Sequence, residues 1–320
     1  MRVLVTGGAG YIGSICAREL VLGGADVVVW DDLSTGHREA VSGELVIGDI
    51  RDHEGLASLL RSGFDAVLHF AGKALVGESI ENPELYYDVN AGGTGALVHA
   101  MVDAGTPCVV FSSTCATYGE PKRVPVDEAH VQAPTSPYGD SKLLAERLLD
   151  AGRGAGIRVC PMRYFNAVGA WPEQDLGESH AVETHLIPLA IGAALGNRPP
   201  LVVNGDDWNT EDGTCVRDYI HVRDLADAHL RALSQLHNGW RGEPVNLGAG
   251  VGTSVREVLA TVERVTGLPV PHRVGPRRKG DPRELFADVS RAAGTLDWKP
   301  RRTIEDAVRD AVAWEHGRKY

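Results

Sequence analysis

Short runs of consecutive apolar residues alternate with longer helical patterns through the first half of the chain. The helical patterns place apolar residues three or four positions apart, whereas the runs between them are continuously apolar. Continuously apolar strands that alternate with helices are typical of a parallel sheet covered by helices on both faces. The pattern therefore predicts an α/β fold with strands over residues 2–6, 26–31, 45–47, 66–70 and 108–112, and helices over 11–22, 83–104 and 136–149.

The amino-acid composition changes after about residue 166. Glycine, proline and acidic residues dominate 169–212, where the one helical pattern covers 187–195. We therefore expect residues 1–165 to form the domain with the parallel sheet, which the chain rejoins at about 220–235. Residues 166–320 are expected to form a smaller α/β substrate-binding region.

Composition excludes several classes of function. The net charge is −11, and the longest basic cluster is Arg277-Arg278-Lys279, which argues against a nucleic-acid partner or an anionic membrane surface. No apolar run approaches 18 residues, so no membrane span is expected. Neither the five cysteines nor the 12 histidines show metal-ligand spacing, so we expect no metal, no disulfide framework and a reducing, cytoplasmic location.

A glycine-rich loop joins the first strand to the first helix. Gly7, Gly10 and Gly13 permit a tight turn, close approach of the backbone to a pyrophosphate, and close packing of helix on strand. The helix that follows offers free N–H groups at its N-terminus. Asp31, at the end of the second strand, is placed to accept hydrogen bonds from both ribose hydroxyls of an adenosine, and Asp32 would repel a 2′-phosphate. The loop therefore predicts a doubly wound Rossmann domain that binds NAD rather than NADP.

Two further groups of residues follow strands of the same predicted sheet. Asp49 and Ile50 come after the third strand, and Phe70, Ala71 and Gly72 after the fourth. Open α/β sheets bind ligands at the carboxyl ends of their strands, so these residues are candidate cofactor contacts. Core packing is the alternative role for Phe70.

Tyr138 and Lys142 lie four residues apart in a predicted helix, with Ser136 as its N-cap and Pro137 at its first position. A tyrosine acting as a base near neutral pH needs its pKa lowered by about 3 units, which is about 4 kcal/mol. A neighbouring ammonium and a positively charged nicotinamide ring are able to supply this. The alternative is a surface pair on a helix. Tyr118 has the same spacing to a lysine, but Gly119 and an intervening proline break that helix.

The fifth strand ends in a series of hydroxyl side chains. Thr114 is our candidate to bridge Tyr138 and a substrate oxygen, although such a residue also satisfies backbone groups at a strand end. Cys115, next to it, has no histidine nearby in sequence and is expected to be an inert thiol.

The order of these motifs resembles the extended short-chain dehydrogenase/reductase family, and within it the nucleotide-sugar 4-epimerases. The resemblance runs through essentially the whole chain, and VRDYIHVRDLA together with RYFN is more specific than the glycine loop. It is carried by TGGAGYIGS, HFAG, VGES, YYDVN, FSSTCATYGE, SPYGDSK, RYFNAVGA, ETHLIP, VRDYIHVRDLADAH, NLGAGVGTSV and PRRKGDP.

The resemblance implies a role for each matching residue. Tyr138 would be the base, Lys142 its partner, which also contacts the cofactor, and Thr114 part of the proton relay. NAD contacts are implied for Gly7, Gly10, Tyr11, Ile12, Gly13, Asp31, Asp49, Ile50, Phe70, Ala71, Gly72, Tyr138, Lys142 and Phe165. Substrate contacts are implied for Thr114, Tyr138, Asn166, Leu186, Arg217, Arg278 and Asp281, where the arginines suit a diphosphate and the aspartate a ribose.

Four positions depart from the family pattern. Ala74 stands where many members have a lysine, with Lys73 one position earlier, and His185 replaces a frequent asparagine. Asn204 replaces the usual phenylalanine near the pyrimidine, and Leu285 occupies the position thought to decide whether N-acetylated sugars fit. The nucleotide base and the hexose therefore stay open.

The expected activity is NAD-dependent inversion of carbon 4 in a nucleotide-diphospho-sugar through a transient 4-keto sugar. UDP-glucose and UDP-galactose are the first-choice substrates; the alternatives are a UDP-N-acetylhexosamine, UDP-glucuronate or dTDP-glucose. Dehydratases of this fold carry an acid after the relay hydroxyl, where this chain has Cys115, whereas a true dehydrogenase stays open. The intact Tyr138 and Lys142 disfavour a non-enzymatic NAD-binding scaffold. By analogy, a homodimer is expected to form through the helices of residues 83–104 and 138–149.

Overall fold

A seven-stranded parallel sheet forms the centre of the computed structural model, which describes residues 1–278 and 280–320. Its strand order is β11-β6-β5-β4-β1-β2-β3. Every neighbouring pair in this order is parallel, which confirms the predicted doubly wound α/β fold. The strands are β1 (Arg2–Thr6), β2 (Asp26–Asp31), β3 (Glu44–Ile47), β4 (Ala66–His69), β5 (Cys108–Thr114), β6 (Arg158–Tyr164) and β11 (Val245–Leu247).

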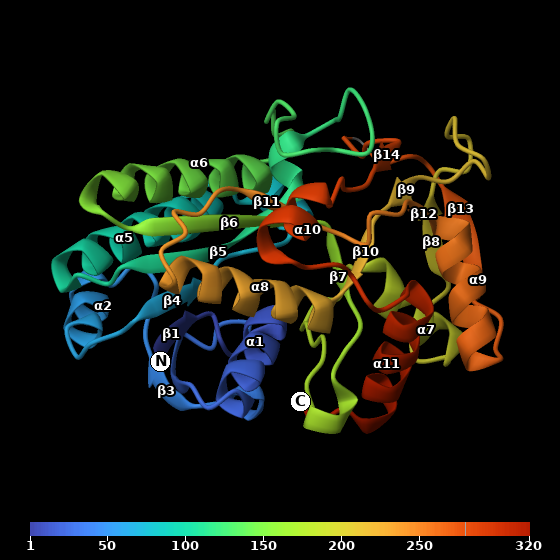
Figure 1. Cartoon of the computed structure of the whole chain (residues 1–320). Coiled ribbons are helices and arrows are strands. Elements are labelled where there is room, and N and C mark those ends of the chain that lie inside the picture. Colours follow the sequence, from blue (N-terminus) through green and yellow to red (C-terminus); the bar gives the residue numbers. More distant parts are fainter. Residues whose placement is uncertain (279) are drawn as a thin grey trace.

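Helices cover both faces of this sheet (Figure 1). On one face α1 (Tyr11–Leu22) packs beside α8 (Val222–His237), and Ile15 and Leu225 are fully buried there. The other face carries α2 (His53–Leu60), α5 (Gly93–Ala104) and α6 (Pro137–Gly152), which bury a second apolar core. Because both faces are covered, the strands are apolar on both sides, which is the pattern read from the sequence.

The strand order reverses between β1 and β4, at the centre of the sheet. On one side of this point the chain runs outward through β2 and β3, and on the other through β5 and β6. The loops that leave the carboxyl ends of β1 and β4 therefore diverge and leave a crevice between them. This is the position in the fold at which a bound dinucleotide is expected.

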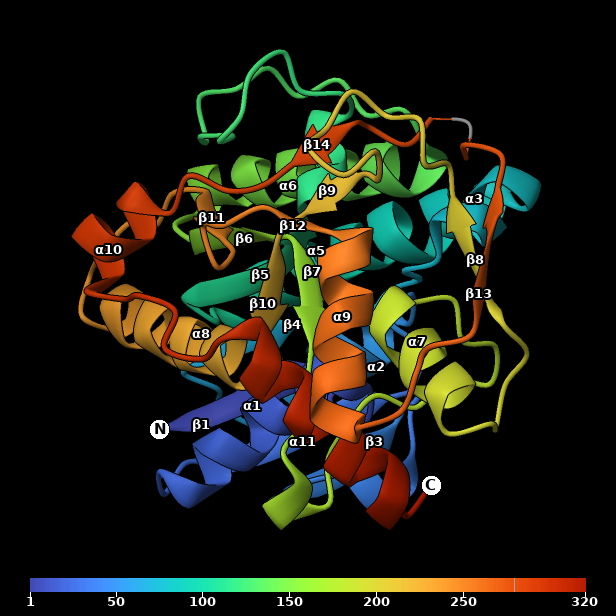
Figure 2. The ribbon, with the colours of Figure 1, turned by 90° about the vertical axis from the view of Figure 1, so that its right-hand side faces the viewer.

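The smaller region lies beyond the carboxyl ends of the strands and is built from short elements (Figure 2). Its strands pair locally, β7 with β10, β8 with β13, and β9 with both β12 and β14. Ile191, Val258 and Val308 bury the apolar faces of three of its helices against one another. The elements are β7 (Asn166–Val168), α7 (Leu186–Ala194), β8 (Leu201–Asn204), β9 (Val216–Arg217), β10 (Tyr219–His221), β12 (Thr253–Ser254), α9 (Val255–Thr266), β13 (His272–Gly275), β14 (Glu284–Leu285) and α11 (Ile304–Gly317).

The chain returns to the large sheet after this region has begun. The return was expected over about 220–235, and the structure extends it to Leu247, because β11 pairs with β6 at the edge of the sheet. Helix α10 (Ser290–Leu296) also packs against α8 and β11. The two parts of the molecule therefore exchange segments of chain several times.

The helix expected over 83–104 is divided in the structure. A short α4 (Pro83–Tyr86) leads into a π-helical turn over Tyr87–Gly92 and then into α5, while α3 (Val76–Glu81) precedes them. The widened turn lets the backbone at Gly93 approach Ile50, since a Cβ on that glycine would lie 2.5 Å from the Ile50 side chain. Such turns occur often at functional sites. No helix among the described residues has the length and apolar character needed to cross a bilayer.

Candidate active site

The glycine loop between β1 and α1 is shaped by close contacts that leave no room for side chains. Gly7 has a φ of +73°, and a Cβ there would lie 2.4 Å from the backbone nitrogen of Ala71. A Cβ on Gly13 would lie 2.2 Å from the carbonyl oxygen of Gly7. The cap position of α1 has no side-chain hydrogen bond, so its first N–H groups stay free. The loop therefore fits a pyrophosphate held by backbone N–H groups.

Asp31 lies at the carboxyl end of β2, where the loop after it turns away from the sheet. Its Oδ2 accepts a hydrogen bond from the backbone N–H of Ala9 at 2.9 Å, and its Oδ1 accepts one from that of Leu33 at 2.8 Å. Burial raises the pKa of this carboxyl group, while the two backbone hydrogen bonds lower it. Each oxygen keeps a lone pair free, which is what binding of two ribose hydroxyls requires.

A groove of about 310 Å³ runs across the carboxyl ends of the central strands. This volume lies at the lower end of the range found for small-molecule sites. Eight predicted cofactor residues line it: Gly7, Gly10, Asp31, Asp49, Ile50, Phe70, Ala71 and Gly72. The other predicted cofactor residues are not among its described lining residues: Tyr11, Ile12, Gly13, Tyr138, Lys142 and Phe165. The hydroxyl of Tyr11 instead donates to the carbonyl of Gly169 at 2.5 Å.

Lys73 and Asp49 place charges at this groove. The Nζ of Lys73 donates to the Ser34 hydroxyl at 3.4 Å and so reaches across from the loop after β4 to the loop after β2. The sequence left this cofactor contact in doubt because Ala74 occupies the expected lysine position. Asp49 is held by Arg51, whose Nε donates to it at 2.9 Å, and this hydrogen bond lowers the pKa of the carboxyl group. The groove therefore has a cation, Lys73, and an anion, Asp49, among its lining residues.

The Tyr138–Lys142 pair lies in the first turns of α6. Ser136 caps this helix by accepting a hydrogen bond from the N–H of Gly139 at 3.2 Å, and Pro137 opens it, as predicted. The Lys142 side chain runs inward, only 4% of the residue is exposed, and its Nζ donates to the carbonyl of Ser112 at 2.9 Å. Helical spacing and strand β5 thus position the ammonium under the end of the strand that carries Thr114.

Burial dominates the pKa values of this pair. The prediction was that a neighbouring ammonium and a positively charged nicotinamide ring together lower the pKa of Tyr138. In the structure burial raises it to about 12, and a hydrogen bond from Thr114 offsets this only in part. Burial also lowers the pKa of Lys142 to about 8. The Lys142 ammonium donates one hydrogen to the Ser112 carbonyl, which leaves its other two hydrogens available for further partners.

Asn90 joins the groove to this pair, and sequence analysis missed it. Its Oδ1 accepts a hydrogen bond from the backbone of Lys73 at 2.7 Å, and its Nδ2 donates to the Ser141 hydroxyl on α6 at 3.0 Å. The loop after β4 is thereby drawn so close that a Cβ on Gly72 would lie 3.4 Å from the Nζ of Lys142. The YYDVN motif contained this residue, but only the π-helical turn turns its amide inward.

The predicted substrate residues gather in the smaller region. The Nη2 of Arg217 lies 3.7 Å from Oδ1 of Asp281, and the Nε of Arg278 lies 4.0 Å from its Oδ2. Burial raises the pKa of the neighbouring Cys115 thiol to about 12, and the Arg217 guanidinium lowers it, so the arginine lies within electrostatic range of the end of β5. The structure therefore groups Arg217, Arg278 and Asp281, and Arg217 is the member whose charge reaches Cys115.

The remaining predicted residues have structural partners as well. Leu186 opens α7, where backbone N–H groups are free, and the Nδ2 of Asn166 donates to the carbonyl of Asp218 at 2.7 Å. Phe165 is buried in an apolar cluster with Leu285. Tyr118, the tyrosine set aside on sequence grounds, is a core residue whose hydroxyl donates to Asn246 at 2.7 Å.

A second group of chemically active side chains lies outside the groove. Glu178, His180, Glu183 and His185 each place one potential ligand atom within 4.8 Å of the others. Ligand spacing gave no sign of a metal, because these residues are separated by one or two positions and meet only through the path of the loop.

Comparison with known proteins extends this geometry to the whole chain. Residues 3–248 match the model of the NAD dependent epimerase/dehydratase family. The UDP-glucose 4-epimerase of Rhizobium meliloti (strain 1021) is 48% identical over 99% of this chain and 98% of its own length. That of Lacticaseibacillus casei is 45% identical over 98% of this chain and 96% of its own length.

Solved structures agree with these relatives. A UDP-glucose 4-epimerase from Stenotrophomonas maltophila, with bound NAD and formylated UDP-arabinopyranose, has a TM-score of 0.96 at 42% identity and covers 99% of this chain and 98% of its own. The Brucella ovis UDP-glucose 4-epimerase in complex with NAD has a TM-score of 0.95 at 47% identity, with the same coverage. With its glycine cradle, its Tyr138–Lys142 pair and this similarity over nearly its full length, the chain belongs to the NAD dependent epimerase/dehydratase family.

Proposed function

We propose that the protein is an NAD-dependent 4-epimerase that interconverts UDP-glucose and UDP-galactose. The relatives and the solved structures with which it is similar over nearly its whole length carry the name UDP-glucose 4-epimerase. The residues of the groove fit the cofactor, because the Gly7 and Gly13 cradle excludes side chains and Asp31 keeps free acceptors. When bound, NAD supplies a reversible acceptor for the hydrogen at carbon 4 of the sugar.

Tyr138 and Thr114 move the proton of the sugar 4-hydroxyl. Thr114 lowers the pKa of the phenol, so we place it beside Tyr138 in a path by which a proton passes between substrate and Tyr138 directly or through the threonine hydroxyl. Because burial holds the pKa of Tyr138 at about 12, the phenolate needs additional positive charge nearby. Lys142 supplies one part of it, and the positively charged ring of the oxidised cofactor the other. Tyr138 therefore loses its proton most readily when both Lys142 and the oxidised cofactor are in place.

The basic groups of the smaller region hold the nucleotide. Arg217 and Arg278 suit a diphosphate, and Asp281 between them suits ribose hydroxyls. Epimerisation requires that the hexose turn over while the nucleotide stays in place, so binding energy has to concentrate on the diphosphate rather than on the sugar. The grouping of Arg217, Arg278 and Asp281 supplies such an anchor for the nucleotide.

One observation carries this proposal: the loop after β4 lies against the Lys142 ammonium, so that the cofactor groove and the proton-transfer pair form one site. The test supplies UDP-galactose, UDP-N-acetylgalactosamine, UDP-glucuronate and dTDP-glucose separately, without added cofactor, and follows the 4-epimer by NMR. We expect conversion of UDP-galactose, with the purified protein carrying NAD. Net consumption of added NAD with release of an oxidised sugar would instead identify a dehydrogenase.

We further propose a cytoplasmic homodimer that pairs through α5 and α6. Val102 on α5 and Leu144 on α6 expose apolar side chains on neighbouring helices, which supports this face as the contact. Light scattering after size exclusion is expected to give twice the chain mass of 34.2 kDa. A Leu144→Arg protein that keeps the dimer mass would place the contact elsewhere.

A further inference from the structure

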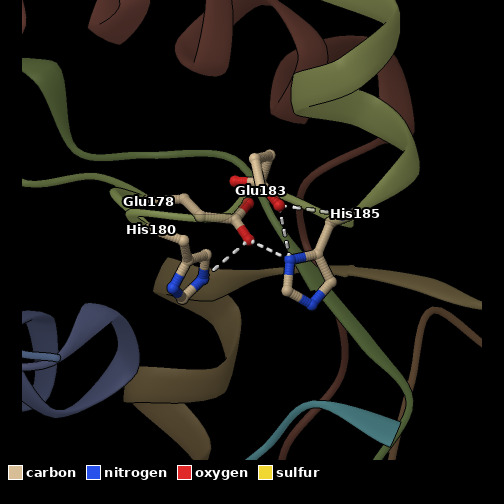
Figure 3. A group of neighbouring side chains, drawn as sticks. All are labelled: Glu178, His180, Glu183 and His185. Carbon is tan, nitrogen blue, oxygen red and sulfur yellow. Dashed lines mark hydrogen bonds and ion pairs between the residues drawn. The ribbon is translucent and has the colours of Figure 1, made fainter. Parts of the chain in front are cut away.

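The loop that precedes α7 gathers two glutamates and two histidines, which we call the His–Glu cluster (Glu178, His180, Glu183 and His185). Figure 3 shows all four side chains turned toward one another. Their ligand atoms lie within 4.8 Å of one another, although no two of these residues are adjacent in sequence. This arrangement lies outside the cofactor groove and serves no step of the proposed reaction.

We propose that the His–Glu cluster binds one divalent transition-metal ion, for which Zn²⁺ is the best match, through one oxygen of each glutamate, Nε2 of His180 and Nδ1 of His185. Two imidazoles and two carboxylates form a donor set that Zn²⁺ takes in tetrahedral geometry. Purely hard cations such as Mg²⁺ prefer oxygen ligands throughout.

The distances within the cluster are close to those of a tetrahedral site. Oε1 of Glu178 lies 3.2 Å from Nε2 of His180 and 2.8 Å from Nδ1 of His185, which is also 2.8 Å from Oε1 of Glu183. Zn²⁺ bonds of about 2.0–2.2 Å separate neighbouring tetrahedral ligand atoms by about 3.3–3.6 Å. These three separations therefore need to widen by well under an ångström, and the other pairs of ligand atoms lie within 4.8 Å. A single hydrogen on Nδ1 would be shared between two carboxylate oxygens, whereas a cation between them contacts both fully.

The burial and the charge of the two glutamates also favour a bound cation. The Glu178 side chain is 8% exposed and that of Glu183 4%, and both point into the cluster. Among the described residues, the ion-pair partners of the two glutamates are His180 and His185, and no lysine or arginine pairs with them. Buried carboxylates need a positive partner. A divalent cation that displaces the imidazole protons would balance both carboxylates.

The surroundings hold the ligands in place. Backbone N–H groups of Thr184 and His185 both donate to Oε1 of Glu183 at 2.8 Å, and Trp314 donates to the carbonyl of Glu178 at 2.9 Å. Contacts of this kind orient ligands around metals. The side chains of His180 and His185 are 29% and 44% exposed. An ion can therefore enter the cluster from solvent on the side of the histidines.

The role of the ion would be structural. The carbonyl of Ser179, inside the loop, lies 3.2 Å from Nε2 of His37, which belongs to the segment after β2, and α7 begins directly after His185. An ion in the cluster would therefore fix the loop that links the cofactor side of the molecule to the substrate side. Because metal binding is measured independently of turnover, this inference stands or falls separately from the proposed epimerase activity.

The test uses full-length protein without a histidine tag, which would itself bind Zn²⁺. We expect elemental analysis to find one Zn²⁺ per chain after growth with zinc, and EDTA to lower the melting temperature by about 5 °C, restored by Zn²⁺. The variant His180→Gln with Glu183→Gln should lose more than about 100-fold in Zn²⁺ affinity by calorimetry, since even outer partners of a metal contribute about 10- to 100-fold. The matched control His237→Gln with Glu211→Gln changes exposed residues elsewhere and should bind as the wild type does.

Co²⁺ gives a second measurement on the unaltered protein. Tetrahedral Co²⁺ absorbs visible light strongly, whereas octahedral Co²⁺ does so only weakly. The proposal is overturned if wild-type protein takes up no more Zn²⁺ than the cluster variant, if EDTA leaves the melting temperature unchanged, if Mg²⁺ binds more tightly than Zn²⁺, or if bound Co²⁺ is octahedral.

Discussion

Burial favours the uncharged form of both Tyr138 and Lys142. It raises the pKa of the phenol to about 12 and lowers that of the ammonium to about 8. Proton transfer from a sugar hydroxyl needs the opposite state, a phenolate beside an ammonium. The site is therefore strained electrostatically until cofactor and substrate are present, which is common for groups held ready for catalysis.

Replacing Tyr138 by phenylalanine removes the proton acceptor and keeps the ring. We expect kcat to fall by about 10²- to 10⁴-fold, the usual contribution of a positioned acid–base group. UDP binding, measured by calorimetry, should stay within a few-fold of wild type, because Arg217 and Arg278 are untouched. A variant that turns over at the wild-type rate would show that another group carries the proton.

Replacing Lys142 by methionine should inactivate the protein and yet stabilise its fold at pH 7. The native pKa of about 8 lies below the ordinary 10.5, so below pH 8 the folded state holds a charge that burial disfavours. That cost is at most about 3 kcal/mol, and loss of the hydrogen bond to Ser112 reduces the gain from removing it.

The stability gain of Lys142→Met should depend on pH. The cost is fully present below pH 8 and fades between pH 8 and 10.5, where the unfolded chain also loses its proton. The advantage of Lys142→Met in urea unfolding should therefore be smaller at pH 9.5 than at pH 7. A variant less stable than wild type at pH 7 would contradict this reading.

At the scale of elements, the start of α6 controls where Tyr138 lies. Replacing Ser136 by alanine removes the hydrogen bond to the N–H of Gly139 and should cost about 1 kcal/mol of stability. Because Tyr138 is in the first turn, we also expect kcat to fall about tenfold, since a displacement of about 1 Å costs up to about 10²-fold.

Ser254 provides the matched control, because it caps α9 through Glu257. Ser254→Ala should lose a similar or larger stability and keep the wild-type kcat. Equal losses of kcat in both variants would show that the effect comes from general destabilisation and not from the position of the phenol.

The sequence predicted several elements of the first half of the chain, because continuous apolar runs and helical spacing are local signals, but it missed β6 and the helices α9 and α11. The helix over Tyr11–Leu22 and the strands over Arg2–Thr6 and Asp26–Asp31 have the expected bounds. It did not predict β11, whose three residues are too few for a pattern, or the π-helical turn, which depends on the packing of Gly93 against Ile50. Such elements are fixed by tertiary contacts.

The residues of the candidate site also divide into those that local motifs predicted and those that depend on tertiary contacts. Motif spacing predicted that Gly7, Asp31 and Phe70 would share one edge of the sheet, and they line one groove. It did not predict Asn90, whose role depends on the shape of a turn. Tyr11, Ile12 and the residues implied as nucleotide contacts stay predictions, since their roles depend on where ligands lie.

At the scale of the whole molecule, Asp224 on α8 ties the two parts together. It is 2% exposed and accepts hydrogen bonds from the backbone of Arg301 and Arg302, each at 2.8 Å, just before α11. Asp224→Ala removes these two acceptors and the ion pair of the buried carboxylate with Arg302, and should lower the free energy of unfolding by about 3 kcal/mol in urea titration. Asp227→Ala, three residues along the same helix, breaks only a half-exposed ion pair with Arg231 and should cost under about 0.5 kcal/mol. Similar losses in both would show that Asp224 holds no special position.

Strand β11 follows its partner β6 only after a long stretch of sequence, which has a consequence for folding during synthesis on the ribosome. Strand β6 is complete at Tyr164, but its partner begins only at Val245, so one edge of the growing sheet stays unpaired while some eighty residues are translated. Unpaired strand edges attract other chains. Nascent chains that stall before Val245 would therefore be the aggregation-prone species, and expression at a slower initiation rate or with chaperones that cover strand edges should favour the soluble protein.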